Sequence, residues 1–315
     1  MKISVVCGSR ANNPELLLKF LQMLDNQTFS DFDVNIVCDR YFSPQEESDF
    51  LSFFKSQNLK VISRTNFFTN NNSKFNPDHK WWASYVRNFW LENAKGKFIQ
   101  LFDDDNEVAQ DFLEKCLKKR ENLTSKNQSE YVILPSLYYR DTDQIQNQWF
   151  SHFNYLQSRP VLHLLNWKKQ AQIQMFSWNW IFWLAETLKK SRYDEQIARI
   201  SEDLDYTLSL HEQWIQLRVF SDLKVKHHER DKTKLEQARI GSYSQAKQKA
   251  RNRFLFTKKH WNKNQIFQFY LCWLPGCLIR LCLKAILFWW KNALSIIKWL
   301  FEWVKEWYKL THKSE

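Results

Sequence analysis

Acidic residues gather at two places in this sequence. Residues 103–105 are three consecutive aspartates, and residues 201–206 read Ser-Glu-Asp-Leu-Asp-Tyr. Carboxylates so close together repel one another, and a bound cation or a proton-transfer reaction is a common reason to keep them together. The first cluster predicts a site for a divalent metal ion and a nucleoside diphosphate. The second predicts the site of a catalytic base.

The elements that must position these clusters alternate between strands and helices. Apolar runs predict strands at 2–7, 34–38, 60–63, 97–102 and 131–135. Asn13-Pro14 begins one predicted helix, and the capping box Ser43-Pro44-Gln45-Glu46 begins another. An aromatic helix is expected before Gly96, and a further helix over 108–119. This alternation predicts an α/β protein with a mostly parallel sheet.

Ligands of such sheets bind beyond the carboxyl ends of the strands. The loop after the first strand, Asp39 after the second and the aspartates 103–105 after the fourth should all lie at that edge. The chain has only four glycines and no Gly-rich dinucleotide or phosphate fingerprint. A nicotinamide-dependent or P-loop enzyme is therefore disfavoured.

Composition indicates a well-packed core, because 44% of the residues are hydrophobic and 17% aromatic. The six cysteines lack metal-ligand spacing and are expected to be free thiols in a reducing compartment. Met1-Lys2 leads directly into the first strand, so we expect no signal peptide and a cytoplasmic location.

Charge is concentrated in the last part of the chain. Residues 241–315 carry 14 Lys and Arg against three Glu, whereas residues 1–240 carry 32 basic against 31 acidic side chains. The same C-terminal tail holds seven of the 16 tryptophans. A basic, Trp-rich tail favours an anionic partner.

The tail has the pattern of an amphipathic helix. Charged residues recur at intervals of three, four or seven, at Arg280, Lys284, Lys291, Lys298, Glu302, Lys305 and Lys309. The uncharged run 264–279 is interrupted by Pro275-Gly276 and is shorter than the ~20 residues of a spanning helix. We expect a helix lying in an anionic membrane surface. The alternative is packing on the catalytic domain or on a second copy, giving a homo-oligomer, and nucleic acid is not expected as a partner.

The order of the motifs over about 1–262 resembles the family 2 glycosyltransferases with the GT-A fold. The similar segments are 13–17, 26–28, 36–39, Arg87-Asn88, the DXD-like strand end 98–105, the ED-like segment 200–208 and the segment 251–261. The resemblance implies a GT-A catalytic domain over 1–240, with a nucleotide-sugar half of about 1–106 and an acceptor half of about 107–240. The tail 241–315 would then serve membrane-surface association.

The resemblance also implies the donor side of a site. A nucleotide-diphosphate sugar would contact Ser9, Asp39, Arg87, Asp103 and Asp104, with Asp39 on the base and Arg87 supporting the nucleotide pocket. A divalent ion, Mn²⁺ or Mg²⁺, would neutralise the leaving diphosphate. Its ligands would be Asp105, Asp103 and, in one of two interpretations, His227; in the other, His227 is an ordinary histidine at a strand end.

An acceptor hydroxyl must lose a proton as it attacks, and a carboxylate can take it. We assign Asp203 as this general base, which implies single displacement with inversion, and Glu202 is the neighbouring candidate. The same acids also suit the first turn of a helix. The acceptor side would include Trp178, Asn179 and Trp180, and the bulky rings there could stack on a sugar or could simply pack in the core.

The expected function is the transfer of a single sugar to a glycan or lipid-linked acceptor. Polymerisation is not expected, because the Gln-x-x-Arg-Trp motif of processive synthases is absent. The enzyme would be peripheral, on the cytoplasmic side of the cell membrane. Two alternatives stay open: a non-catalytic glycan- or membrane-binding module of the same fold, and a nucleotidyltransferase.

Overall fold

The computed structural model describes most of the predicted catalytic domain and parts of the tail. The described residues are 2–9, 14–38, 45, 59–63, 82–124, 130–139, 149–154, 159–162, 170–176, 181–197, 202–227, 251–252, 255–268, 271, 279, 297–298, 301–302 and 304–305. The expected capping-box helix lies outside them except for Gln45.

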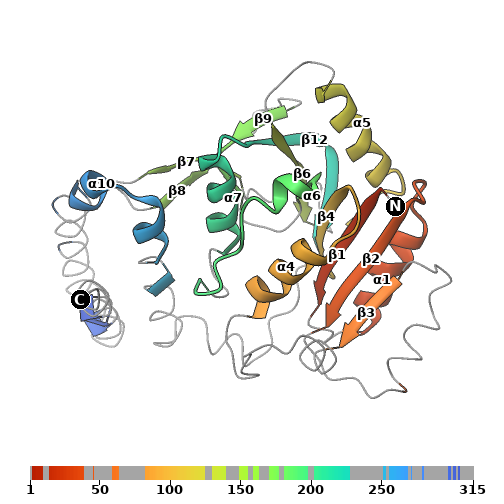
Figure 1. Cartoon of the computed structure of the whole chain (residues 1–315), viewed down its shortest axis with the longest axis horizontal. Coiled ribbons are helices and arrows are strands. Elements are labelled where there is room, and N and C mark those ends of the chain that lie inside the picture. Colours follow the sequence, from red (N-terminus) through yellow and green to blue (C-terminus); the bar gives the residue numbers. More distant parts are fainter. Residues whose placement is uncertain are drawn as a thin grey trace.

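One large mixed sheet forms the centre of the molecule (Figure 1). Its strand order is β3 (Leu59–Ser63), β2 (Phe32–Cys38), β1 (Ile3–Ser9), β4 (Phe98–Asp103), β11 (Phe182–Leu184), β6 (Tyr131–Tyr139), β12 (Gln216–His227) and β5 (Asn106–Val108). A further strand, β9 (Gln170–Ile173), also pairs with β12. Strands from both predicted halves of the catalytic domain therefore belong to a single sheet, and the predicted α/β fold class is confirmed.

The strand directions determine which chain segments can meet at one edge of the sheet. β1 runs parallel to β2 and β4, and β6 runs parallel to β12. β11 is antiparallel to both β4 and β6, so these two strands point the same way. The carboxyl ends of β1, β4, β6 and β12 consequently lie along the same edge.

Helices cover both faces of the sheet (Figure 1). On one face, α1 (Pro14–Asp25) and α5 (Phe112–Thr124) contact β4: the Phe102 ring lies 5.8 Å from Phe20 and 5.7 Å from Phe112. On the other face, Val86 of α4 (Trp82–Asn93) lies over Gly8 of β1. The short α6 (Ala185–Leu188) directly follows β11.

A second, smaller sheet adjoins α7 (Glu202–Glu212). It is antiparallel, with the order β10 (Met175–Phe176), β7 (Trp149–Asn154) and β8 (Arg159–Leu162). The Phe176 backbone N–H donates to the Thr207 hydroxyl of α7 at 3.1 Å. α7 therefore has its own support beside the main sheet. The described chain continues through helical residues 255–260 to α10 (Lys263–Gln268).

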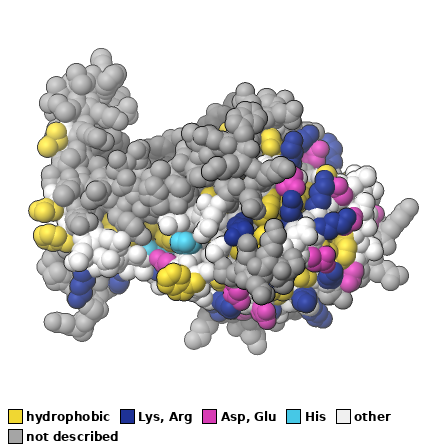
Figure 2. Space-filling model, turned by 90° about the horizontal axis from the view of Figure 1, so that it is seen from above, with side chains coloured by type: hydrophobic (Ala, Val, Ile, Leu, Met, Phe, Trp, Pro, Cys, Tyr) yellow, Lys and Arg dark blue, Asp and Glu magenta, His cyan; other side chains and the backbone are white. Residues whose placement is uncertain are grey.

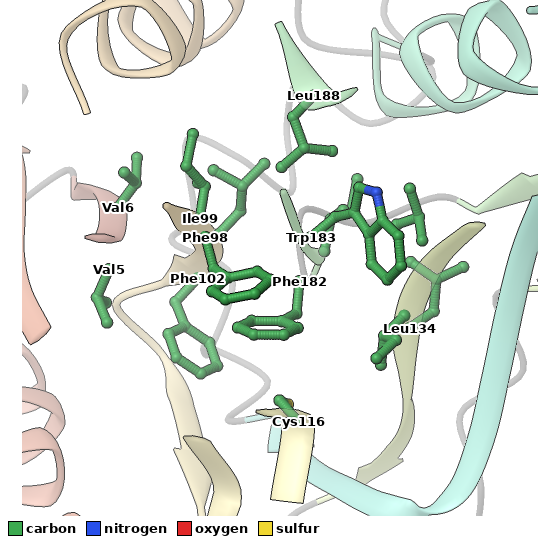
Figure 3. Close-up of a cluster of buried hydrophobic side chains, with 14 of the residues drawn as sticks. Val5, Val6, Phe98, Ile99, Phe102, Cys116, Leu134, Phe182, Trp183 and Leu188 are labelled. Atoms are coloured by element: carbon green, nitrogen blue, oxygen red, sulfur yellow. The ribbon is translucent and has the colours of Figure 1, made fainter. Parts of the chain in front are cut away.

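Aromatic side chains fill the core where β4, β11 and β6 pair (Figure 3). Phe98 stacks on Phe182 at 5.4 Å, and Tyr131 packs at 4.8 Å against Trp183. Burial of such side chains contributes about 1.5–3 kcal/mol each. The two described cysteines with free thiols, Cys7 and Cys116, are also buried. This core fixes the strand ends that carry the acidic residues.

The predicted helix over 108–119 is wrong at its start. Residues 106–108 form β5, and α5 begins only at Phe112. The reason is a long-range pairing: Asn106 and Val108 face His227 and Val225 of β12. The predicted strand 131–135 is correct in type but continues to Tyr139, because β12 pairs with it beyond a bulge.

Candidate active site at the carboxyl ends of the strands

Three residues that are far apart in the sequence meet at the sheet edge. Ser9 ends β1, Asp103 ends β4 and His227 ends β12. The pairing of β12 with β5 sets His227 opposite Asn106, immediately after the aspartates 103–105. The expected placement of these aspartates at the carboxyl edge agrees with the structure.

The acidic turn is held by Asn106. Its side-chain oxygen accepts a hydrogen bond from the Asp103 backbone N–H at 2.9 Å, and its amide donates to Asp105 at 3.2 Å. His227 Nε2 lies 3.5 Å from Asp105 Oδ2, and the His227 side chain is buried. The structure therefore brings His227, the last residue of β12, beside the acidic turn, and its role as a metal ligand stays a prediction.

Ser9 is hydrogen-bonded to Asp104, the middle residue of this turn. Both are buried, and the Ser9 hydroxyl donates to Asp104 Oδ2 at 2.5 Å. Since they come from neighbouring strand ends, the bond joins the end of β1 to the turn after β4. Contact of either side chain with a nucleotide sugar stays a prediction.

Crowding of negative charge changes the acidity of the turn. Burial, together with the charge of Asp105, raises the pKa of Asp103 to about 7, although Arg87 and His227 oppose the rise. Within the residues that the structure describes, no three His, Cys, Asp or Glu side chains are arranged to hold one metal ion.

The second acidic cluster forms the first turn of α7, which agrees with the sequence-based prediction that these acids begin a helix. Glu202 is its first residue and Asp203 its second. Arg87 of α4 reaches both carboxylates through Nη1, at 3.1 Å from Glu202 and 3.0 Å from Asp203. Its guanidinium also lies over the Tyr193 ring at 5.3 Å. One arginine therefore joins α4, α7 and the chain between α6 and α7.

These ion pairs are largely shielded from water. The side chain of Arg87 is 16% exposed, that of Glu202 9% and that of Asp203 18%. Burial raises the pKa of Asp203 to about 8; Arg87 opposes the rise, while Glu202 and Asp103 add to it. Burial also disfavours the charge of Arg87, but Asp203 and Glu202 outweigh it and raise the arginine's pKa. Because Asp103 adds to the rise in the pKa of Asp203, and Arg87 lowers the pKa of both aspartates, the two acidic clusters form one electrostatic unit.

The sequence did not predict this role of Arg87. It was expected to support a nucleotide pocket, whereas its ion pairs in the structure go to the first turn of α7. The adjacent Asn88 also joins α4 to the chain between α6 and α7. Its side-chain amide donates to the Tyr193 carbonyl at 2.9 Å and accepts from the Tyr193 N–H at 2.8 Å. The sequence pair Arg87-Asn88 indicates a functional position, but its partners lie more than a hundred residues away and cannot be identified from local sequence. Asp39, Trp178, Asn179 and Trp180 lie outside the described residues.

Comparisons with known proteins give a fold and no family. No protein-family profile and no curated protein matches the sequence. Among solved structures, residues 1–349 of S. aureus TarS in complex with UDP match with a TM-score of 0.52 and 16% identity, over 79% of this chain and 64% of that chain. The complex with UDP-GlcNAc matches with a TM-score of 0.51 and 15% identity, over 85% and 78%.

This likeness confirms the expected fold, a mostly parallel α/β sheet flanked by helices. The chain spans less than two thirds of the length of the UDP-bound TarS chain. At such low identity the match carries the fold alone. The residues of the site therefore have to support any function by their own geometry.

The Arg87 ion pairs give a pH-dependent prediction for stability. Replacing Arg87 with Met leaves Glu202 and Asp203 buried without their cation, a loss of about 3–5 kcal/mol when both are ionised. Arg87 opposes the rise in the pKa of Asp203, so its loss moves this pKa above the wild-type value of about 8. The stabilities of the two proteins then diverge in the pH range where only the wild-type carboxyl group is ionised. We expect the penalty of Arg87→Met to be small at pH 6 and to grow as the pH passes about 8.

Urea unfolding of both proteins at pH 6 and pH 9 measures this difference. The matched control is Arg192→Met, since Arg192 also has two acidic partners but is 63% exposed. A penalty for Arg87→Met that is equal at the two pH values would contradict the electrostatic unit.

Proposed function

We propose that this protein is an inverting, metal-dependent glycosyltransferase that moves one sugar from a nucleotide-diphosphate donor to an acceptor. The observation that carries the proposal is that Arg87 pairs with Glu202 and Asp203 in the first turn of α7, while its charge also acts on Asp103 at the end of β4. A metal-bound diphosphate and the proton transfer each need a carboxylate, and the two acidic clusters can supply them.

Support for the donor class comes from the fold likeness. The TarS structures of similar fold hold UDP and UDP-GlcNAc, a nucleoside diphosphate and a nucleotide sugar. A ligand of this class would bind at the carboxyl edge of the strands in this protein too. Ser9, Asp39, Asp103 and Asp104 are the proposed donor contacts, on a domain of residues 1–240.

The chemistry of the acidic turn fits a divalent cation. Carboxylate oxygens are the ligands that Mg²⁺ and Mn²⁺ prefer, and the charge of Asp105 already raises the pKa of Asp103. Asp105 and Asp103 would hold the ion, with His227 beside Asp105, and the diphosphate would supply further oxygens. When bound, the ion neutralises the charge that develops on the leaving diphosphate.

Asp203 is the proposed general base. Its raised pKa of about 8 lies near the operating range in which a base can both stay ionised and accept a proton. Arg87 opposes the rise, so it increases the fraction of Asp203 that is ionised near neutral pH. The carboxylate takes the proton from the acceptor hydroxyl as the hydroxyl oxygen attacks the anomeric carbon and the bond to the diphosphate breaks. Attack opposite the leaving group inverts the configuration.

A change at Asp203 tests the base. Asp203→Asn keeps the shape of the side chain but cannot accept a proton, so transfer should fall by about 10²–10⁴-fold. Donor affinity should change little, because the proposed donor contacts lie elsewhere. Initial rates and calorimetric donor binding on the same protein measure both. Glu202→Gln is the matched control, and loss of transfer in that variant alone would move the base to Glu202.

A change at Asp105 tests the metal site. Asp105→Ala should abolish the Mn²⁺-dependent part of UDP binding, because one of the two carboxylate ligands is lost. Calorimetry with and without Mn²⁺ measures it, and the exposed Glu107→Ala of β5 serves as control. Undiminished metal-dependent binding by Asp105→Ala would remove this residue from the site.

The acceptor would be a glycan or a lipid-linked sugar at the cytoplasmic face of the cell membrane. Three apolar residues of the described tail support a surface-bound tail: Ile297, Phe301 and Val304 follow at helical spacing and are exposed by 46%, 76% and 47%. Figure 2 shows apolar side chains at the edge formed by the C-terminal residues, while charges of both signs alternate over the body. No described helix is long and apolar enough to cross a bilayer.

Removal of residues 269–315 tests this attachment. The full chain should sediment with anionic liposomes, because each Lys or Arg near the surface adds about 1 kcal/mol and the apolar face adds more. High salt should release it only in part. A chain ending at Gln268 should stay in the supernatant and still bind UDP. Sedimentation of this shortened chain, or a full chain that ignores liposomes and forms soluble oligomers, would favour self-packing of the tail instead.

A further inference from the structure

A buried charged network ties the start of the C-terminal segment to α7. His260, the last residue of the helical stretch 255–260, stands between two carboxylates of α7: Nε2 lies 2.8 Å from Asp205 and Nδ1 lies 2.8 Å from Glu212. The neighbouring Lys259 reaches the other oxygen of Asp205 at 2.7 Å. In Figure 1 this stretch runs beside α7.

The network lies in the protein interior at its centre. The side chains of Asp205 and His260 are 0% exposed, while Glu212 and Lys259 are partly open to water. The Phe256 ring packs at 4.7 Å against the imidazole. An ionised Asp205 at such depth requires charged partners, and both of those given by the structure come from the C-terminal segment.

Asp205 is two residues from Asp203 on the same helix, and Arg87 holds the first turn of that helix. Its far end, Glu212, is held by His260. Because an α-helix is stiff over eleven residues, the position of Asp203 depends on both attachments.

We propose that His260 is a positioning residue that couples the C-terminal segment to the base Asp203 through α7, and that the coupling depends on the imidazolium. This inference rests on the proposed function only in taking Asp203 as the base. The connection would let the attachment of the tail affect the rate of proton transfer.

The dependence on charge follows from the two contacts. Only the imidazolium donates from both ring nitrogens, whereas the neutral ring has one N–H and must turn an acceptor nitrogen toward a carboxylate. The charged groups that face His260 in the described structure are Asp205 and Glu212 from α7, with Lys259 beside it. Burial lowers the pKa of His260, but its two carboxylate partners outweigh burial and raise it.

A histidine with a raised folded pKa gives stability that is fully present below its unfolded pKa of about 6.5. This stability is lost as the pH rises through the folded pKa. The contacts of His260 with Asp205 and Glu212, called the tie below, should therefore be formed in mildly acid solution and should weaken on the alkaline side.

Hydrogen exchange of the full chain between pH 6 and pH 9, corrected for intrinsic exchange rates, measures the tie directly. In the wild type, amides of residues 255–268 should lose protection by about tenfold as the pH rises, the size expected for one charge-assisted hydrogen bond. In His260→Gln this pH dependence should be absent. Asp103 and Asp203 titrate in both proteins, so subtracting the protection of His260→Gln from that of the wild type removes their contribution.

Two further variants keep the test decisive if His260→Gln folds poorly. Glu212→Gln changes a partly exposed carboxylate and should move the loss of protection to lower pH, because His260 loses one of the charges that raise its pKa. His211→Gln is the matched control, since His211 lies on α7 but has a lowered pKa, and it should behave as the wild type. Wild-type pH dependence in both His260→Gln and Glu212→Gln would overturn the proposal.

The rate of transfer separates positioning from simple stability. The alkaline fall of kcat should shift in Glu212→Gln together with the exchange transition, while the affinity for UDP stays unchanged. A kcat profile that does not follow the exchange transition would exclude the positioning role. If no nucleotide sugar is turned over by the wild type, the proposed function fails, yet the exchange experiment still tests the tie.

Discussion

The ion pairs of Arg87 with Glu202 and Asp203 are the interaction on which the rest of the site depends. They join α4, which lies on the sheet, to α7, which follows a long excursion of the chain through the smaller sheet. Without a buried cation at this point, two adjacent carboxylates would face each other in surroundings that disfavour charge. The same guanidinium acts on Asp103 at the end of β4, so it links both acidic clusters.

The crowding of buried carboxylates makes ionisation of this site unfavourable. The pKa values of Asp103 and Asp203 rise to about 7 and about 8, far above those of ordinary aspartates. Such shifts reduce the stability of the folded protein at neutral pH and are typical of functional sites. Elsewhere the fold is conventional: aromatic packing between β4, β11 and β6 supplies a rigid base for the strand ends.

Much of this arrangement could be predicted from the sequence, because it depends on residues that are close together in the chain. Strand β4 with its terminal aspartates, α1 after Asn13-Pro14, and the acids at the start of α7 follow from periodicity and capping rules. The parts that could not be predicted depend on distant partners. Residues 106–108 form a strand because β12 pairs with them. The burial of Asp205 can be understood from its ion pairs with Lys259 and His260, which lie more than fifty residues further along the chain. Local patterns contain no information on such contacts.

The configuration of the sugar product tests the central claim most directly. The protein would be incubated with Mn²⁺ and a panel of α-linked nucleoside-diphosphate sugars, beginning with UDP-GlcNAc, and early products would be followed by proton NMR. We predict that water, in place of the acceptor, attacks the anomeric carbon in a single displacement, which releases the nucleoside diphosphate together with a β-configured free sugar. An α-configured product would contradict the role of Asp203 as base, and a complete lack of turnover across the panel would contradict glycosyl transfer itself.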